Sequence, residues 1–225
     1  MIYAPLTSFV RSTDMALAIG AAISENGQAL VNTIVNGKEG VQPSTGAAGE
    51  VFVGFAALQT SAAPVLPTSI VRVEELVVPA SGVIALAKTP LTGSVHVAKA
   101  SDNSAVAVNA VTGVNVDVTA ANADLLVRVT YRAALTVAEA RAKVGDVQPG
   151  GYSGNIVGQA GVGQQGVIYT SAFDTSKDWS AATAIKLGAN GVLTDSGTGA
   201  TIKAVVVHLP SVDYPFLGLR FNAEV

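Results

Sequence analysis

The sequence contains no cysteine, and it is poor in charged and aromatic side chains. Without cysteine there are no disulfide bonds and no thiolate metal sites, so durability has to come from packing or from assembly. Charged residues make up 13% of the chain, whereas about a quarter is usual for a soluble domain. Such a surface is weakly solvated, and we expect much of it to contact other protein. The net charge is −3 and the lysines and arginines form no cluster, so the sequence predicts no nucleic-acid partner.

Long hydrophobic runs are lacking as well, although the mean hydropathy is +0.46. Polar residues, glycine or proline interrupt every apolar stretch before the roughly 20 residues that a membrane-spanning helix needs. The short apolar run at 15–23 resembles the hydrophobic segment of a signal peptide. However, residues 1–10 contain no basic side chain, and no small-x-small cleavage site follows the run. We therefore expect no membrane partner and no signal peptide.

Apolar and polar residues alternate along much of the chain, as they do in strands with one buried face. The clearest case is 126–132, in which Val127, Val129 and Tyr131 share one face. Further strand candidates are 71–73, 94–97, 114–118, 201–209 and 214–221. Asn-Gly, Ser-Gly and Thr-Gly pairs separate these runs at short intervals, which is typical of sandwiches and barrels and not of βαβ units. The sequence therefore predicts an all-β fold.

One short helix is predicted at 137–144. Thr136 and Glu139 stand at capping-box spacing at its start, and Gly145 occupies the position at which helices commonly end. Residues 14–24 are a second, weaker helix candidate, because the run is rich in alanine but isoleucine and glycine interrupt it.

Four regions follow from these signals. Residues 1–67 form the N-terminal part of a β domain and end in a proline-containing connection. Residues 68–135 contain enough short strands for an immunoglobulin-like sandwich. Residues 136–166 hold the short helix and a Gly/Gln-rich arm, which we expect to be an extended loop. Residues 167–225 return to strands and form the C-terminal part of the β domain.

The two terminal regions contain a faint repeat, in which a turn and a strand precede Phe-x-Gly-apolar at 51–55 and again at 215–219. Either these segments build corresponding strands of one domain, or the pairs recur by chance in a biased composition. On the first reading, the fold class is a β-barrel or β-sandwich domain built from the N- and C-terminal segments, with an inserted immunoglobulin-like β-sandwich and one short helix.

A motif match at Gly161–Gly166 reads Gly-x-Gly-x-x-Gly, the pattern of dinucleotide-binding loops. That chemistry requires a helix after the glycines, because the helix N-terminus holds the pyrophosphate. The residues that follow, 167–170, are strand formers. We interpret the segment as a flexible loop and predict no cofactor.

The two histidines, His96 and His208, lie in predicted strands and lack the spacing of a zinc site. We expect His208 to pack in a core or an interface and His96 to point to solvent. A calcium site between loops is a weaker alternative to solvated turn carboxylates for four residues. These are Asp102, Asn103, Asp117 and Asp124. We predict no metal site.

Asp174 and Asp178 flank Trp179, the single tryptophan, and paired carboxylates beside an aromatic ring occur in glycoside hydrolases. The chain has few other aromatic residues to line a sugar-binding groove, so a turn that Asp174 caps and Trp179 packs against is the preferred interpretation. No serine stands in a Gly-x-Ser-x-Gly elbow. We assign no catalytic residue and expect the protein not to be an enzyme.

Several stretches resemble capsid decoration proteins of tailed bacteriophages, also called cement proteins. Near the N-terminus they are 27–31 and 40–56, the latter reading Gly-Val-Gln-Pro-Ser-Thr-Gly-Ala-Ala-Gly-Glu-Val-Phe-Val-Gly-Phe-Ala. Near the C-terminus they are 188–193, 205–210 and 215–222. The resemblance covers the two terminal thirds of the chain and includes no catalytic motif.

The resemblance implies a virion structural protein that is assembled in the host bacterial cytoplasm and binds the exterior of an icosahedral capsid. Its partners would be the major capsid protein and further copies of itself, as a homotrimer, and repeated weak contacts would supply avidity. The contact residues would lie in the Gly/Gln-rich arm and near the C-terminus. They are Gly158, Gln159, Gly161, Gly163, Gln164, Gln165, Phe216 and Leu217.

Other functions stay open. A phage tail or fibre component and a bacterial surface adhesin share the all-β, low-charge character, although fibres usually show long repeats. A glycan-acting enzyme domain that uses Asp174, Asp178 and Trp179 is the alternative from a different class.

Overall fold

The computed structural model describes residues 7–25, 27–57, 68–144 and 159–223, with no side-chain description for 141–144. These residues form mainly β-strands, with one short α-helix and a single 3₁₀ turn at Ala120–Asn122 among them. The all-β prediction is therefore confirmed. In the parts of the chain described, no helix has the length and apolarity to cross a membrane.

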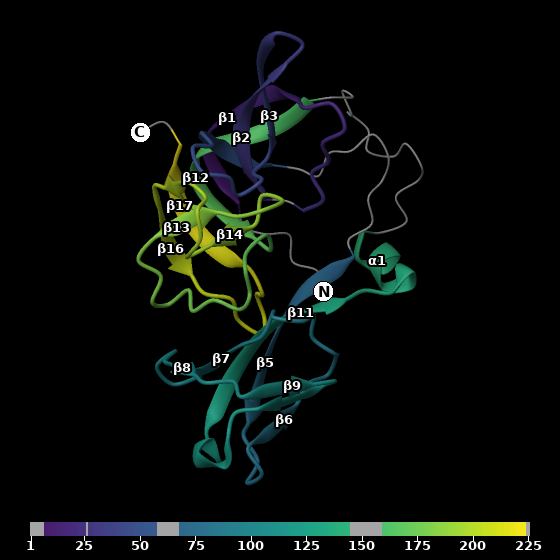
Figure 1. The fold of residues 1–225 in the computed structure, drawn as a ribbon, viewed down its shortest axis with the longest axis vertical. Helices are drawn as coiled ribbons and strands as arrows, with labels where there is room; N and C mark the ends of the chain where they lie inside the picture. The colour runs from purple at the N-terminus through teal and green to yellow at the C-terminus, as the bar shows by residue number, and fades with distance from the viewer. Residues whose placement is uncertain (1–6, 26, 58–67, 145–158, 224–225) are drawn as a thin grey trace.

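A seven-stranded sheet forms the upper body in Figure 1, in the order β1-β3-β2-β4-β12-β17-β16. Its strands are β1 (Ser8–Leu17), β2 (Ala29–Val35), β3 (Lys38–Pro43), β4 (Phe52–Ala56), β12 (Gln159–Thr170), β16 (Ala204–His208) and β17 (Leu217–Asn222). β1 also pairs with β12, so five of the strands close into a ring from which β17 and β16 extend. As predicted, strands from both ends of the chain build one sheet. We call this part the base.

The base buries both faces of its central strands. In β2, Ala29 and Val31 face one core and Leu30 faces the other. The inner core lies within the ring and includes Val41 and Val162. The outer core contains Phe55 and is covered by a small sheet of β13 (Ile185–Leu187), β14 (Leu193–Thr194) and β15 (Thr201–Ile202). This double burial explains why β2 reads as a continuous apolar run at its start.

The lower body in Figure 1 is a sandwich of a four-stranded and a three-stranded sheet, with strand orders β5-β11-β7-β8 and β6-β10-β9. Its strands are β5 (Ser69–Val77), β6 (Val83–Ala85), β7 (His96–Lys99), β8 (Ala105–Val106), β9 (Ala110–Thr112), β10 (Asn115–Asp117) and β11 (Leu126–Ala134). The fully buried Tyr131 lies in the core between the sheets. We call this part the insert.

The insert has the strand number and layering of an immunoglobulin-like sandwich but not the usual connectivity. In an immunoglobulin domain the first and last strands lie in opposite sheets. Here the first and last strands, β5 and β11, are neighbours that pair antiparallel from Ser69 opposite Ala134 to Val77 opposite Leu126. Adjacent ends suit a domain inserted within another, because the chain has to leave the base and return to it at one place.

The helix α1 (Val137–Val144) follows β11 as predicted. Thr136 Oγ1 accepts from the backbone N–H of Glu139 at 3.2 Å, and a Glu139 carboxylate oxygen accepts from the N–H of Thr136 at 2.9 Å. This reciprocal pair confirms the capping box. Lys88 of the insert donates to the same carboxylate. Gly145, the expected end of the helix, lies outside the described residues.

The expected second helix at 14–24 is wrong. Residues as far as Leu17 belong to β1, in which Asp14 lies opposite Gly161 and Met15 opposite Ala160. The half-buried Met15 packs beside the inner core and Leu17 belongs to it. Helix propensity is a weak preference, and the long pairing with β12 outweighs the alanine content of this run.

The expected Gly/Gln-rich loop is also wrong from residue 159 onward, because Gln159–Thr170 forms β12, the longest strand of the sheet. Two glycines of β12 let residues of β1 approach its backbone closely. A Cβ on Gly163 would lie 2.2 Å from the ring of Phe9, and one on Gly166 would lie 2.2 Å from the carbonyl oxygen of Ser8. Glycine inside a strand commonly marks such contacts. Residues 145–158 of the predicted arm lie outside the described part of the chain.

Candidate functional site

Most of the predicted contact residues lie in β12, where they do not form an arm. Gly161 and Gly163 pair with Asp14 and Ser12 of β1, and Gly163 also pairs with Phe55 of β4. Gly163 is buried, while Gln159 at the start of the strand is exposed. Gly158 lies outside the described residues. The prediction of a free, partner-seeking segment therefore fails for the described part, because strands on both sides already use its backbone.

Gln164 and Gln165 sit at an irregularity of the β1–β12 pairing, where Gly163 pairs with Ser12 and Gln165 pairs with Arg11. Gln165 is half-buried and lies opposite Asn222 of β17. The side-chain carbonyl oxygen of Gln164 is buried, and no described group donates to it.

The other two predicted contact residues differ in accessibility. Leu217 is fully buried in the outer core, so it is not available to a partner, and this prediction is wrong. Phe216 is half-buried and its ring centroid lies 5.0 Å from that of Tyr214. Only Phe216 of the pair lies near the surface.

The dinucleotide pattern at Gly161–Gly166 lies wholly inside β12. A phosphate cradle needs successive free N–H groups at a helix N-terminus. This segment instead continues as strand to Thr170 and pairs with its neighbours. The segment is thus a strand and not the expected loop, and no helix follows it directly to form such a cradle.

A cluster of aromatic side chains lies where β12, β17 and β16 meet. The Tyr169 ring packs edge-on against His208 and Tyr214, with centroid separations of 5.7 and 5.3 Å. Nδ1 of His208 lies 3.2 Å from the carbonyl oxygen of Phe216. Gly218 makes the packing possible, since a Cβ there would lie 2.8 Å from the Tyr169 ring. His208 is thus half-buried among neighbouring rings and is not part of the outer core, so the core position expected from the sequence is not found.

The strand β16 beside this cluster exposes two valines. Val205 is 56% exposed and Val207 is 45% exposed, while Val206 between them packs against the outer core. Arg220 of β17 lies directly opposite Val205 and is exposed. Sequence analysis assigned this segment to a strand and included it in the resemblance to decoration proteins, but it named none of these valines as a contact residue. The observable signal was the run of three valines, which exposes alternate side chains when only one face is buried.

A polar network fastens the insert to the base. Arg132 of β11 donates to Glu25 Oε1 at 3.0 Å and to the carbonyl oxygen of Ser171. The hydroxyl of Ser171 donates to the other Glu25 oxygen at 2.7 Å. Nearby, the buried Thr175 hydroxyl donates to the carbonyl oxygen of Ser94 at 2.6 Å. These four contacts join residues distant in sequence, so we call this boundary the seam.

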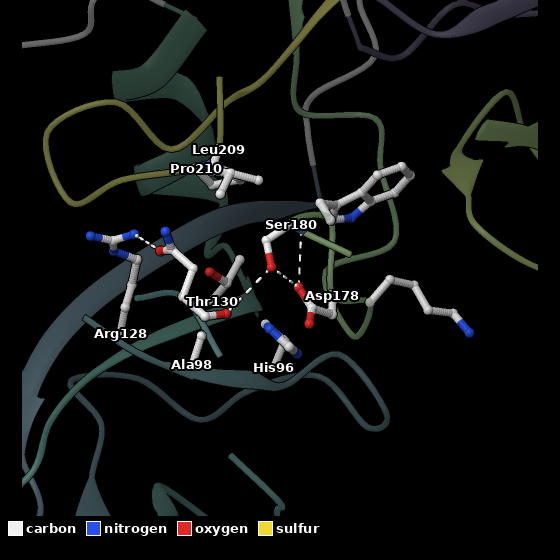
Figure 2. A pocket seen from close by; sticks show the side chains of 11 residues that line it. His96, Ala98, Arg128, Thr130, Asp178, Ser180, Leu209 and Pro210 are labelled. Atoms are coloured by element: carbon white, nitrogen blue, oxygen red, sulfur yellow. Dashed lines mark hydrogen bonds between the residues drawn. The ribbon is translucent and has the colours of Figure 1, made fainter. Parts of the chain in front are cut away.

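Figure 2 shows a small cavity in the seam, lined from the insert by His96, Ala98, Arg128 and Thr130. From the base, Asp178, Ser180 and the Leu209-Pro210 pair face it. Its volume of about 40 Å³ suffices for a water molecule and falls far below the few hundred Å³ of usual ligand sites.

His96 was expected to point to solvent, and this is wrong, because it lines the seam cavity and is half-buried. Desolvation lowers the pKa of His96, and the negative charge of Asp178 partly opposes that shift. Alternation along a single strand cannot reveal this, because the base covers the face that would otherwise be exposed.

The geometry around Asp178 differs from a hydrolytic triad. Ser180 Oγ donates to Asp178 Oδ1 at 2.6 Å, so the carboxylate, and not His96, accepts from the hydroxyl. In a triad the histidine lies between the two. Asp178 serves here to close a turn, since it also accepts from the Ser180 N–H at 3.0 Å.

The neighbouring turn follows the preferred sequence interpretation. Asp174 Oδ1 accepts from the N–H of Ser176 at 3.0 Å, and the Trp179 ring N–H donates to the Asp174 carbonyl oxygen at 2.9 Å. Trp179 is buried and packs edge-on against Phe173. Asp174 caps and Trp179 packs, so the ring is not a sugar-stacking platform.

A larger cavity of about 390 Å³ lies on another side of the seam, with Arg132, Asp174 and Thr175 among its lining residues. Each of these polar groups already has an intramolecular partner. In the described ranges no group of three or more His, Asp and Glu side chains is placed to hold a metal ion. Of the four residues weighed for calcium, Asp102 accepts from the N–H of Ser104 and Asp117 from that of Thr119.

Comparisons with protein-family models, with curated proteins and with solved structures find no match to this chain.

Proposed function

We propose that the protein is a virion structural protein that decorates the outside of an icosahedral tailed-phage capsid and stabilises the contacts between capsomers. The observation that carries the proposal is the low-charge surface of the base, on which aliphatic side chains stand exposed. Ile34 is 71% exposed, Val10 78% and Ile19 87%. Exposed apolar groups on a surface with few charges cost little to desolvate, so they favour broad, repeated contact with protein.

The two-body architecture supports the same function. The insert leaves and rejoins the base through the paired strands β5 and β11, and the seam holds it by an ion pair and by hydrogen bonds. Figure 1 shows the insert as a separate lobe below the base. A lobe mounted in this way can project from a surface on which the base lies.

The resemblance of the terminal segments to decoration proteins concerns the segments that build the base. Residues 40–56 include β4 and part of β3, and 215–222 include β17. We therefore assign the contact with the major capsid protein and the self-association, as a homotrimer, to the base. Nothing in this role calls for a cofactor, a nucleic acid or a membrane.

Co-sedimentation with expanded, undecorated capsids tests the proposal. We expect the purified protein to bind at a copy number comparable to that of the major capsid protein and to be oligomeric by light scattering. A few copies per particle would favour a tail or fibre component instead. A strictly monomeric protein without affinity for capsids would contradict decoration.

The alternative from another class has its own test. Alanine replacement of Asp174 and Asp178 would abolish a glycosidase activity if that pair of carboxylates were catalytic; Trp179 is kept, because it is buried in the outer core of the base. We expect the parent protein to show no hydrolysis. A measurable hydrolysis that is lost in the folded double variant would overturn the structural role.

A further inference from the structure

β16 has one unpaired edge. It is the last strand of the seven-stranded sheet, and in the described part of the chain it pairs only with β17. The carbonyl oxygen of Lys203, just before β16, accepts from the N–H of Asn222 at 3.3 Å. Backbone groups in an antiparallel ladder alternate between the two sides of a strand. Ala204 and Val206 therefore direct their N–H and C=O groups away from β17.

The side chains of β16 fit an edge that receives a partner. Val206 packs on the outer core and thereby holds the strand in place, while Val205 and Val207 are exposed. A further strand added at this edge would find both free backbone groups and an apolar strip. Unpaired apolar edges of this kind are normally protected from association.

The protection of β16 is confined to its ends. Lys203 precedes the strand, a pairing irregularity lies between Val206 and His208, and Pro210 follows. These features lie at the two ends of the strand and leave the unpaired backbone edge of 204–207 accessible. The long edge strand of the insert, β5, carries the charged residues Arg72, Glu74 and Glu75 in its middle.

The charged residues on the outward face of Lys203, β16 and β17 have one sign. Lys203 and Arg220 lie on the exposed face with Val205, since Arg220 is directly opposite Val205 and Lys203 is two residues away. Tyr169, Val167 and Gln165 are the outward residues of the adjoining part of β12. None of these outward positions on β16, β17 and 165–169 carries a carboxylate, although the chain as a whole has a net charge of −3. This face therefore attracts a partner that carries carboxylates.

We infer that the free edge of β16 and the face of Val205, Val207 and Arg220 bind an extended segment of the capsid protein. The segment adds antiparallel or parallel to β16 and presents apolar residues to the valines and at least one carboxylate to Arg220 or Lys203. A second copy of β16 fits less well, because it would place lysine and arginine of both copies against one another. The inference depends on the proposed decoration function, since that function supplies the capsid.

Two variants with matched controls test the surface. Val205→Lys replaces the centre of the apolar strip, and Val77→Lys makes the same change at a similarly exposed valine of β5 in the insert. Arg220→Glu reverses a charge on the face, and Lys38→Glu changes the net charge by the same amount on β3. In co-sedimentation with expanded capsids we expect Val205→Lys and Arg220→Glu to lower affinity at least tenfold, and both controls to stay within about twofold of the parent.

Hydrogen exchange tests the added strand itself. The amides of Ala204 and Val206 should exchange rapidly in the free protein and at least tenfold more slowly on capsids, with no such change at β5. Circular dichroism and melting of each variant verify that the base is folded.

The outcomes separate the two claims. If the parent binds capsids while Val205→Lys and Arg220→Glu bind as the controls do, the docking surface is wrong and decoration stands. If the variants lose affinity but the two amides gain no protection, the added strand is wrong. If the parent does not bind capsids at all, decoration fails and the docking surface fails with it.

Discussion

The edge strands of the two bodies differ in how they meet solvent. β5 of the insert carries three charged side chains, of which Glu75 pairs with Arg128 at 2.9 Å and Arg72 lies 3.6 Å from Glu74. β16 of the base exposes valines and leaves 204–207 unguarded. Charges on an edge oppose strand addition, and an open apolar edge permits it. This contrast is the reason why we propose that β16 of the base, and not β5 of the insert, receives a partner strand.

The cores of the two bodies differ as well. The base has one core inside its ring and another under the small sheet, whereas the insert has a single core between two sheets. The insert is thus the simpler unit, and its stability should depend more on each central side chain. The difference between the two bodies can be tested by substitutions in the core of the insert, then in the seam, and then at a single charged side chain.

The largest expected effect comes from removing the central aromatic of the insert. Tyr131→Ala should destabilise the insert by about 3–5 kcal/mol, as for other buried aromatics, because the side chain is fully buried in a single core. Calorimetry should show a separate, lower transition, and base-mediated capsid binding should persist. Tyr131→Phe is the control, with a loss of about 1–2 kcal/mol from the hydrogen bond to Glu74. Simultaneous unfolding of both bodies would show that they are one cooperative unit.

A smaller effect is expected at the seam. Arg132→Met removes the cation that bonds to Glu25 and Ser171, and both charged side chains are mostly buried, with 15% and 22% exposure. We expect a loss of about 2 kcal/mol in the coupling of the two bodies, below the full cost of breaking a deeply buried pair. Limited proteolysis of the connections should accelerate. The double variant with Glu25→Gln should recover part of the loss, and no recovery would argue that Arg132 acts through packing alone.

The seam should also respond to mild acid. Burial lowers the pKa of His96 below its usual 6.5, against the opposing charge of Asp178, with Arg128 and Lys177 also lining the cavity. The unfolded or opened state then binds the proton more readily than the folded state does. The contribution of neutral His96 to the stability of the seam is therefore complete above about pH 6.5, and it is lost as the pH falls through the lowered pKa of the folded state. Proteolysis of the seam at decreasing pH should show the change. His96→Gln should remove it, and an unaltered pH profile in that variant would assign the effect elsewhere.

The smallest effect concerns a single exposed carboxylate. The hydrogen bond from Lys88, followed by those from Thr136, lowers the pKa of Glu139 to about 2. The ionised Glu139 carboxylate stabilises the start of α1. This contribution to stability is present above the ordinary pKa of 4.5 and is lost as the pH falls through about 2. NMR titration of Glu139 should give this midpoint, and Lys88→Met should raise it. A midpoint near 4.5 in the parent would show that the link between α1 and the insert does not form in solution.

Local patterns predicted local elements well. The capping box at Thr136 and Glu139 produced α1, and alternation at 126–132 produced β11 with Tyr131 inward. The turn at Asp174 and the burial of Trp179 also followed from sequence. For the helix and the turn, the decisive contacts lie within a few residues of one another, whereas β11 was predicted from its alternation although its partner strands are distant in sequence.

Predictions about 14–24, Gly161–Gly166 and His96 failed because their partners are distant in sequence. β1 and β12 form a ladder across about 150 residues, and the base covers His96 from a separate segment. Of the predicted contact residues, the structure leaves Gln165 and Phe216 near the surface that we infer to be functional and buries Leu217.

The sequence by itself determined that this chain is all-β and weakly charged, because composition and period-two alternation act locally. It left open whether the two ends of the chain build one domain, which the seven-stranded sheet decides. Only the tertiary structure decided which strand keeps a free edge. Pairing on one side and packing of Val206 beneath leave Val205 and Val207 outward at the end of the sheet. Edge position is a property of the order of strands, which no single run of residues contains.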